Sequence, residues 1–136
     1  SDTAKSHVLD VSRTSQTIYA SSRQRRFHSD KDIKAVQSFL EKNVQNKCTL
    51  SELALRHNMT ERTLIRRFKS ACDITPGQYL QSLRIEHARK LLETSSMPLE
   101  SVISAVGYED LSSFTRLFKK TTGLSPSQYR AKFKRG

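Results

Sequence analysis

Residues 60–79, TERTLIRRFKSACDITPGQY, return fifty positions later as residues 110–129, DLSSFTRLFKKTTGLSPSQY. The repeat keeps basic, apolar and turn-forming residues in one register, which predicts two copies of one structural unit. The residues that match between the copies are Arg66 and Arg116, Phe68 and Phe118, Lys69 and Lys119, Pro76 and Pro126, Gln78 and Gln128, and Tyr79 and Tyr129. We therefore expect the functional residues of the protein to lie in this duplicated element.

The residues before and within the first copy predict two short helices joined by a tight turn. Thr49 and Glu52 have the spacing of a capping box, in which the threonine hydroxyl accepts from the third helical amide and the glutamate reaches back. Asn58 tolerates a positive φ and suits the turn. Thr60 is an N-cap for a helix that runs to about Cys72. Two short helices joined by about three residues are typical of a helix-turn-helix.

The same pattern restarts after a long helix. Pro76 opens a helix predicted over residues 76–93, about 27 Å long at 1.5 Å per residue. Pro98 then opens a short helix, Gly107 supplies a turn, and Asp110 caps the next helix. The turn in this second copy is one residue longer than the turn in the first. The sequence therefore predicts two helix-turn-helix units, one on each side of a connector helix.

The N-terminal part differs in composition from the repeats. Its polar, basic stretch lacks helical periodicity and is interpreted as a linker, in which Arg23, Arg25 and Arg26 are either solvated or in contact with phosphates. Ordered structure is expected to begin near Asp30, the N-cap of an amphipathic helix over about residues 31–45. We therefore predict an all-α fold of about seven helices, with two helix-turn-helix subdomains joined by a long connector helix. The predicted boundaries are 1–29 for a linker or the tail of a missing upstream domain, 30–75 for the first subdomain, 76–93 for the connector and 94–136 for the second subdomain.

Charge points to a polyanionic partner. The chain has 136 residues and a formal net charge of +11, from 24 basic and 13 acidic residues. Such a charge indicates nucleic acid or an anionic membrane surface as the partner. No apolar run is long enough to span a membrane and no secretory signal pattern is present, so a cytoplasmic, nucleoid-associated location is expected. Cys48 and Cys72 lack metal-ligand spacing and are expected to be reduced packing residues.

The residue types needed for catalysis are present but not grouped. The histidines are scattered, and no cysteine, serine or carboxylate forms a triad or a metal-binding spacing with them. We therefore expect a protein that is not an enzyme, with no catalytic residue, no metal site and no cofactor.

The helices that begin after Thr60 and Asp110 carry the residues expected to contact DNA. A recognition helix presents polar side chains to the major groove and keeps its apolar side on the core. An arginine in the middle of such a helix can bind guanine through two hydrogen bonds, worth about 1–3 kcal/mol of discrimination. The predicted DNA-binding residues are Arg62, Thr63, Ile65, Arg66, Arg67, Lys69, Ser112, Ser113, Thr115, Arg116, Lys119 and Lys120.

Residues from about 30 to 135 resemble the DNA-binding domain of the AraC/XylS family of bacterial transcription regulators. The motif that carries the resemblance is Gly107-Tyr108-Glu109-Asp110, Ser112-Ser113-Phe114, Arg116-Leu117-Phe118-Lys119-Lys120, Gly123-Leu124-Ser125-Pro126 and Tyr129-Arg130. The resemblance implies that each subdomain places one recognition helix in successive major-groove segments on one face of the DNA. It implies that the base-reading residues are Arg62, Ile65, Arg66, Ser112, Ser113, Thr115 and Arg116.

Three residues depart from the family pattern. Asn58 stands where the family has a turn glycine, and Ile65 puts an apolar group at a base-reading position, where it suits a thymine methyl group. Ile103 replaces a small residue at a helix crossing and is expected to push the helices of the second motif apart. Residues 13–16 and 27–30, RTSQ and FHSD, are similar to the junction in regulators whose N-terminal half is a DJ-1/PfpI-like domain, which implies a sensing half upstream.

The leading prediction is a sequence-specific, double-stranded DNA-binding transcription regulator, specifically an activator. RNA polymerase is a candidate second partner, no membrane partner is expected, and this piece is expected to be monomeric while the full-length protein is a candidate dimer. The alternative is a basic helical protein-interaction or membrane-surface module. That alternative predicts sequence-indifferent binding and gives no reason for the repeated caps, turns and arginines.

Overall fold

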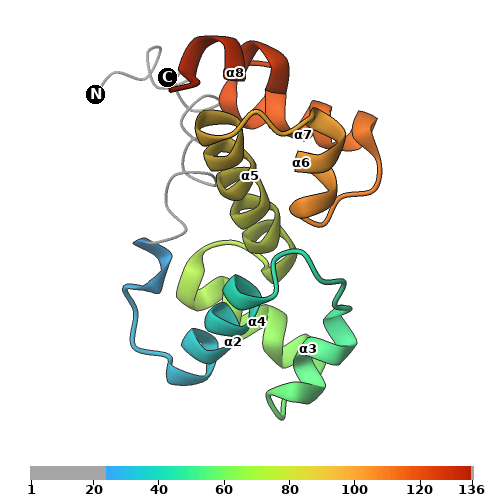
Figure 1. Ribbon diagram of the computed structural model, residues 1–136. Helices are drawn as coiled ribbons and strands as arrows, with labels where there is room; N and C mark the ends of the chain where they lie inside the picture. The colour runs from blue at the N-terminus through green and yellow to red at the C-terminus, as the bar shows by residue number, and fades with distance from the viewer. Residues whose placement is uncertain (1–23, 136) are drawn as a thin grey trace, which may run out of the picture.

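The computed structural model describes residues 24–135, which contain seven α-helices, one short 3-10 helix and no strand (Figure 1). The elements are η1 (Gln24–Arg26), α2 (Lys31–Lys42), α3 (Leu50–Arg56), α4 (Glu61–Cys72), α5 (Pro76–Thr94), α6 (Leu99–Ala105), α7 (Leu111–Thr122) and α8 (Pro126–Phe133). The predicted all-α fold, with a long helix between two helix-turn-helix units, is confirmed.

Side-chain caps begin most of the helices, which is why their starts follow the sequence closely. The Thr49 hydroxyl accepts a hydrogen bond from the Glu52 amide at 3.1 Å, and the Glu52 carboxylate accepts one from the Thr49 amide at 2.8 Å. Helices α5 and α8 begin with the same box, built on Thr75 and Ser125. Each box satisfies two of the amides that a helix N-terminus leaves without partners.

Residues with a positive φ lie in the turn of each unit and directly after its longer helix, α4 or α7. Asn58 and Gly107 lie in the turns with φ of 57° and 90°, and Asp73 and Gly123 follow α4 and α7 with φ of 70° and 85°. Asparagine and aspartate tolerate this conformation better than other residues with a side chain. The positive φ expected for Asn58 is therefore confirmed, and Asp73 adopts the same conformation after α4.

Helices α2–α4 gather at one end of α5 and α6–α8 at the other (Figure 1), and each group encloses an apolar core. A buried tyrosine packs against a phenylalanine in each core, because the repeat brings them together twice. Tyr79 lies 5.5 Å from Phe68 between ring centroids, and Tyr129 lies 5.4 Å from Phe118. The first core holds Ile33, Val36, Leu40, Leu53, Ala54, Leu64, Phe68, Cys72, Ile74 and Tyr79. The second holds Ile85, Ala88, Leu92, Val102, Ile103, Val106, Phe114, Phe118 and Tyr129.

Ile103 does not keep the second motif's helices from packing. Its side chain is 4% exposed within the second core, and its carbonyl accepts a hydrogen bond from the Tyr108 amide at 3.0 Å. Helices α6 and α7 pack against each other in this core. The bulky residue therefore fills space in the core rather than opening the helix pair.

Ordered structure begins before the predicted start near Asp30. Arg25, in η1, is 8% exposed, and its guanidinium donates to the Cys72 carbonyl at the end of α4. The Arg25 carbonyl accepts from Nε2 of Gln37 at 3.2 Å. The expectation that Arg25 is solvated or binds phosphate is wrong, because its side chain is buried and its guanidinium is bonded to the end of α4. The predicted phosphate contact of Arg23 and the junction at 13–16 lie outside the described residues.

The ends of two helices also differ slightly from the prediction. Helix α2 ends at Lys42 rather than near residue 45, where the Asn43 side chain donates to the Phe39 carbonyl at 2.8 Å. Helix α5 extends to Thr94, one residue beyond the predicted end. Within residues 24–135, none of these helices combines the length and the apolar character needed to cross a membrane.

Candidate nucleic-acid interface

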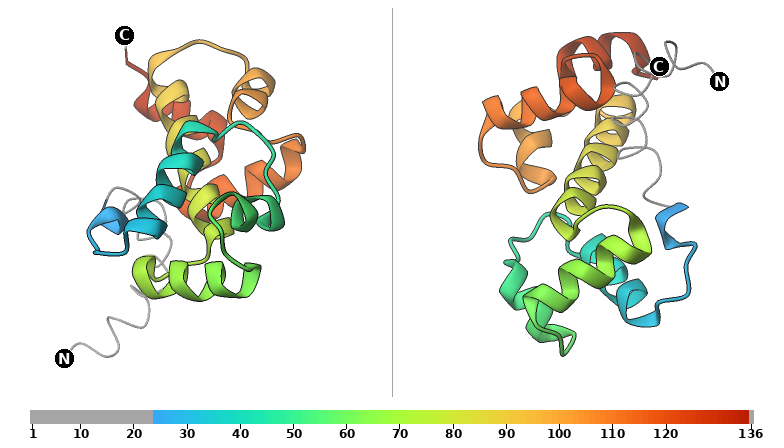
Figure 2. Two further views of the ribbon diagram at one scale, coloured as in Figure 1. Left: turned by 90° about the horizontal axis from the view of Figure 1, so that it is seen from below. Right: turned by 180° about the vertical axis from the view of Figure 1, so that it is seen from behind.

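Helices α4 and α7 each follow a short helix and a turn, and each turns one side to a core. Leu64 and Phe68 on α4 are fully buried, as are Phe114 and Phe118 on α7. The preceding helices α3 and α6 lie at opposite ends of α5 but on the same side of it, in the front and rear views alike (Figures 1 and 2). The connector thus holds two helix-turn-helix units that face one way.

The outer face of α4 carries a continuous stripe of exposed side chains. Arg62, Ile65, Arg66 and Lys69 are all exposed and recur at steps of three and four residues, which places them on one face of the helix. Among the described residues, none of the ion pairs involves Arg62, Arg66 or Lys69. The stripe therefore presents three cations and one apolar side chain to a partner.

Helix α7 presents the corresponding face with a different chemistry. Ser112, Arg116 and Lys119 are exposed at steps of four and three residues, and the exposed Lys120 lies beside them. Thr115 is only half exposed. This second face has one more lysine in its last turn than the first, but it has a serine where α4 has Arg62 and a threonine where α4 has Ile65.

Two predicted DNA-binding hydroxyls are engaged in starting the helices. The Thr60 hydroxyl donates to the Thr63 hydroxyl at 2.9 Å, and the Ser113 hydroxyl donates to the Asp110 carboxylate at 2.6 Å. The hydrogen bond from Ser113 lowers the pKa of Asp110, because it stabilises the ionised carboxylate. Thr63 and Ser113 occupy equivalent positions of the repeat, so both copies use this hydroxyl at the helix N-terminus.

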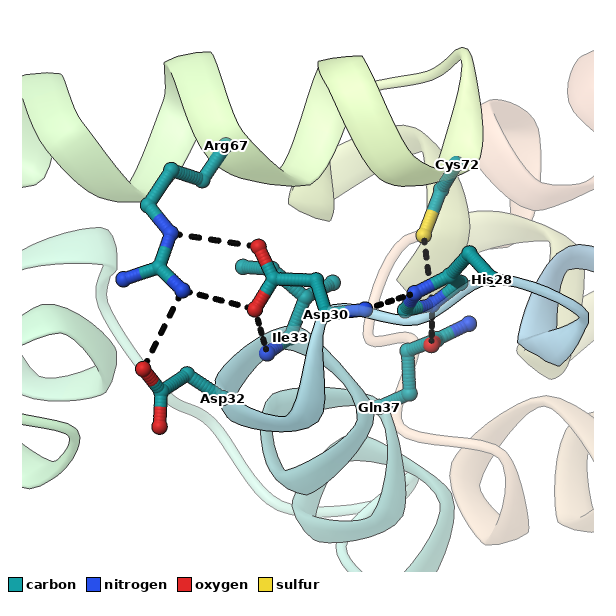
Figure 3. Close-up of polar contacts among 7 residues, drawn as sticks. All are labelled: His28, Asp30, Asp32, Ile33, Gln37, Arg67 and Cys72. Carbon is teal, nitrogen blue, oxygen red and sulfur yellow. Dashed lines mark hydrogen bonds and ion pairs between the residues drawn. The ribbon is translucent and has the colours of Figure 1, made fainter.

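The Arg67 side chain points toward the start of α2, where it meets two carboxylates (Figure 3). Its Nε donates to Asp30 at 3.1 Å, and one terminal nitrogen donates to Asp30 at 2.7 Å and to Asp32 at 3.1 Å. Two of its three guanidinium nitrogens are held by carboxylates, an observation against the predicted DNA-binding role of Arg67. Its equivalent in the second copy is Leu117, a packing residue of the second core. Arg67 fastens the recognition helix α4 to the start of α2.

This contact makes stability depend on pH. Burial alone raises the pKa of Asp30, but hydrogen bonds from Arg67 and from the Ile33 amide outweigh it and leave the pKa below its usual value. A carboxyl group with a lowered pKa in the folded state stabilises the fold above the pKa of the unfolded chain. That contribution is lost as the pH falls through the folded-state pKa.

Replacing Arg67 is expected to test this fastening. Arg67→Ala should lower the thermal midpoint of unfolding at neutral pH, and the difference from wild type should shrink in acid as Asp30 protonates. Thermal unfolding followed by circular dichroism across acidic and neutral buffers measures both. A difference between the two proteins that stays constant with pH would contradict the role given to the Asp30 pair.

Sequence reasoning missed the partners of Arg67, although it identified Asp30 as an N-cap residue. The contacts join positions 37 and 35 residues apart, and no periodicity within either helix reports them. A usable signal was the comparison of the two copies, since an arginine aligned with a core leucine does not belong on the exposed face.

Comparison with known proteins agrees with this geometry. A helix-turn-helix domain profile matches residues 53–132. The MmsAB operon regulatory protein of Pseudomonas aeruginosa is 34% identical over 105 residues, which are 77% of this chain and 34% of that protein. The transcriptional activator NphR of Rhodococcus sp. is 36% identical over 104 residues, 76% of this chain and 31% of NphR. This chain thus spans about one third of the length of these relatives.

A solved structure gives the same result in three dimensions. The DNA-binding domain of the global transcriptional factor AdpA, solved in complex with a target DNA, superimposes with a TM-score of 0.73 at 29% identity. The match covers 76% of this chain and 94% of the AdpA chain. The duplicated units, the profile match and this structural similarity show that the chain belongs to the AraC/XylS family of transcription regulators, with its described residues forming the family's DNA-binding domain.

Proposed function

We propose that the protein binds a specific double-stranded DNA site and inserts α4 and α7 into two successive major-groove segments on one face of the duplex. The observation that carries this proposal is the duplicated exposed stripe, which lies on the side of each helix opposite its core. A basic, solvated helix surface alone gives no reason for two such stripes at equivalent positions of a repeat. Recognition helices that are one helical turn of DNA apart require this arrangement.

The two helices are proposed to read DNA differently. On α4, Arg62 and Arg66 are placed to donate to base edges, and Ile65, at 36% exposed, suits contact with a thymine methyl group. On α7, base contact rests mainly on Arg116, while hydroxyl groups bind bases or phosphates less selectively. The proposed contacts are Arg62, Thr63, Ile65, Arg66 and Lys69 on α4, with Ser112, Ser113, Thr115, Arg116, Lys119 and Lys120 on α7.

The wider role proposed is transcription activation in the bacterial cytoplasm. A relative named as a transcriptional activator supports this, and activation brings RNA polymerase in as a second partner. We propose that residues 30–75 and 94–136 act as the two DNA-reading subdomains and 76–93 as their connector, because each half has its own core. The piece binds as a monomer in this proposal, and any dimerisation belongs to other parts of the full-length protein.

Arginine substitutions on the two stripes test base reading directly. Arg66→Ala is expected to relax preference at one base pair and to cost on the order of 1–3 kcal/mol of specific binding, because a bidentate contact to guanine is lost. Arg116→Ala should do the same in the other half of the site. Selection of sites from random duplexes, followed by affinity measurements on the selected site, reads out both effects.

The neighbouring Arg67→Ala serves as the matched control. It removes a cation from the same helix, but one that is paired with α2, so it should leave the base preference unchanged. If Arg66→Ala and Arg67→Ala alter the selected sites equally, the base-reading role of the α4 stripe is refuted.

Competition with unrelated DNA separates the proposal from the membrane-surface or protein-interaction alternative. A specific reader keeps its labelled site in the presence of excess random duplex, whereas an unspecific basic surface is displaced. Affinity for both should fall with salt, because lysine and arginine release counterions from phosphates. Equal displacement by specific and random duplex would favour the alternative.

A further inference from the structure

The loop after α2 and the turn between α6 and α7 come together beside Arg84, near the middle of α5. The Nε of Arg84 donates to the Val44 carbonyl at 2.9 Å, and a terminal nitrogen lies 3.4 Å from the Asn46 carbonyl. The same guanidinium lies 5.4 Å from the centroid of the Tyr108 ring. One side chain on the connector therefore contacts the first subdomain with its edge and the second with its face.

The backbone of the second turn is pressed against this arginine. A Cβ atom at Gly107 would lie 2.9 Å from the Val44 carbonyl oxygen and 3.1 Å from Nε of Arg84, and the residue has a φ of 90°. Asn58, at the equivalent place in the first turn, is exposed and carries a side chain at a φ of 57°. The φ of 90° at Gly107 already strains any residue with a side chain, and the close approach of the other subdomain gives a second reason for glycine in this turn.

The contact continues into the second recognition helix. Tyr108 packs edge-to-face against Phe114 of α7, with ring centroids 5.3 Å apart. Phe114 is fully buried under the exposed stripe of α7. A shift of Arg84 relative to Tyr108 would therefore be passed to α7 through two packed rings.

We propose that Arg84 is a positioning residue that fixes the orientation of α7 relative to α4 and so sets the spacing between the two DNA segments that the protein accepts. The inference rests on the proposed DNA-binding function and deepens it. Arginine suits the role because its planar fork can donate to two carbonyls while its face stacks on an aromatic ring. Lysine keeps the charge but offers no fork and no plane, so Arg84→Lys isolates the geometry of the contact from its charge.

The first experiment measures spacing tolerance. Wild type, Arg84→Lys and Arg84→Met are titrated against the selected DNA site and against duplexes in which the two half-sites are moved one base pair closer or further apart. Wild type should prefer its own spacing by about tenfold or more, because a rigid pair of helices cannot follow a displaced half-site. Both variants should flatten this preference to about threefold or less while keeping affinity for a single half-site.

A matched control lies in the same contact region. Lys47 and Glu109 form an ion pair of 2.7 Å across the two subdomains, and both side chains are largely exposed. Exposed pairs contribute little, so Lys47→Ala should leave the spacing profile unchanged. Thermal unfolding of each variant confirms that binding is measured on folded protein.

A second experiment reads the orientation without DNA. Spin labels are placed at Lys69→Cys on α4 and Lys119→Cys on α7, in a Cys48→Ser background, while the buried Cys72 is left in place because burial raises its thiol pKa to about 11. The distribution of label distances should be narrow in wild type and broad in Arg84→Lys and Arg84→Met.

The outcomes distinguish the positioning role of Arg84 from the proposed DNA-binding function. Flattened spacing preference together with a broadened distance distribution supports the positioning role. An unchanged distribution overturns it, whatever happens to affinity, as does a spacing profile that survives both substitutions. If wild type itself selects no DNA sequence, the proposed function fails, and the positioning of DNA segments fails with it.

Discussion

Leu83→Pro is expected to uncouple the two halves of the protein and to reduce specific DNA affinity on the order of 10²-fold or more, since two linked readers would then bind as separate ones. Position 83 lies where α5 passes from one core to the other. Leu83 packs against the first core, whereas Ile85 belongs to the second. A break at this point leaves each core with its own part of the helix.

The physical reason is the loss of the helical hydrogen bond at the joint. Proline has no amide hydrogen to donate to the carbonyl four residues earlier, and its ring clashes with that carbonyl, at a cost of about 3 kcal/mol or more in a helix interior. The carbonyl concerned is that of Tyr79, which also accepts from the Ser82 hydroxyl at 2.8 Å. The kink would change the angle between the two ends of α5 and thereby between α4 and α7.

Leu83→Ala is the control that distinguishes the helix break from lost packing. Alanine removes most of the same side chain but keeps the amide and favours the helix. It should weaken the first core modestly and leave the ratio of specific to half-site binding close to that of wild type. Titration of the full site and of single half-sites provides that ratio, and a Leu83→Pro protein that retains full specific affinity would show that a rigid connector is unnecessary.

Phe118→Ala is expected to destabilise the second core by about 3–5 kcal/mol, as truncation of a fully buried phenylalanine does elsewhere. The Phe118 ring contacts Phe114 and Tyr129, with centroids 5.6 Å and 5.4 Å away. Tyr129 in turn accepts a 2.6 Å hydrogen bond from Arg89. The loss therefore reaches the recognition helix and its supports, and a small domain has only about 5–15 kcal/mol of stability to lose.

The repeat supplies a matched partner for this substitution. Phe68→Ala removes the equivalent ring from the first core, where it packs on Tyr79. Because the cores are separate clusters, hydrogen exchange should accelerate mainly in α6–α8 for Phe118→Ala and mainly in α2–α4 for Phe68→Ala. Uniform acceleration over both halves in either variant would mean that the chain unfolds as a single cooperative unit.

Local rules account for how much of the fold could be predicted from the sequence. The capping box at Thr49, the proline at the start of α5 and the left-handed Asp73 are decided by residues within a few positions of one another, so the helix starts and ends were largely readable. The exposed stripe on α4 followed from periodicity for the same reason. The end of α2 was misjudged because a single asparagine side chain folds back onto the Phe39 carbonyl.

Contacts between segments distant in the sequence could not be predicted from these local rules. Nothing local shows that Arg67 meets Asp30, that Arg25 reaches the Cys72 carbonyl, or that Arg84 lies between Val44 and Tyr108. The arginines thus have four environments: an exposed stripe on α4, a carboxylate pair, a buried helix end and an inter-subdomain contact. Net charge and spacing treat all of them alike.

The duplicated stretch at residues 60–79 and 110–129, together with the short helix and turn before each copy, therefore determined from the sequence that the protein has two helix-turn-helix units, where their recognition helices begin and which sides of them are apolar. Those features depend on backbone propensity, caps and periodicity, which act over a few residues. The tertiary structure alone decided which basic side chains remain exposed and unpaired and how the two units are held relative to one another. Those features depend on the close approach of segments about 40 residues apart, such as Arg84 and Val44, and only the folded chain brings such groups within hydrogen-bonding distance.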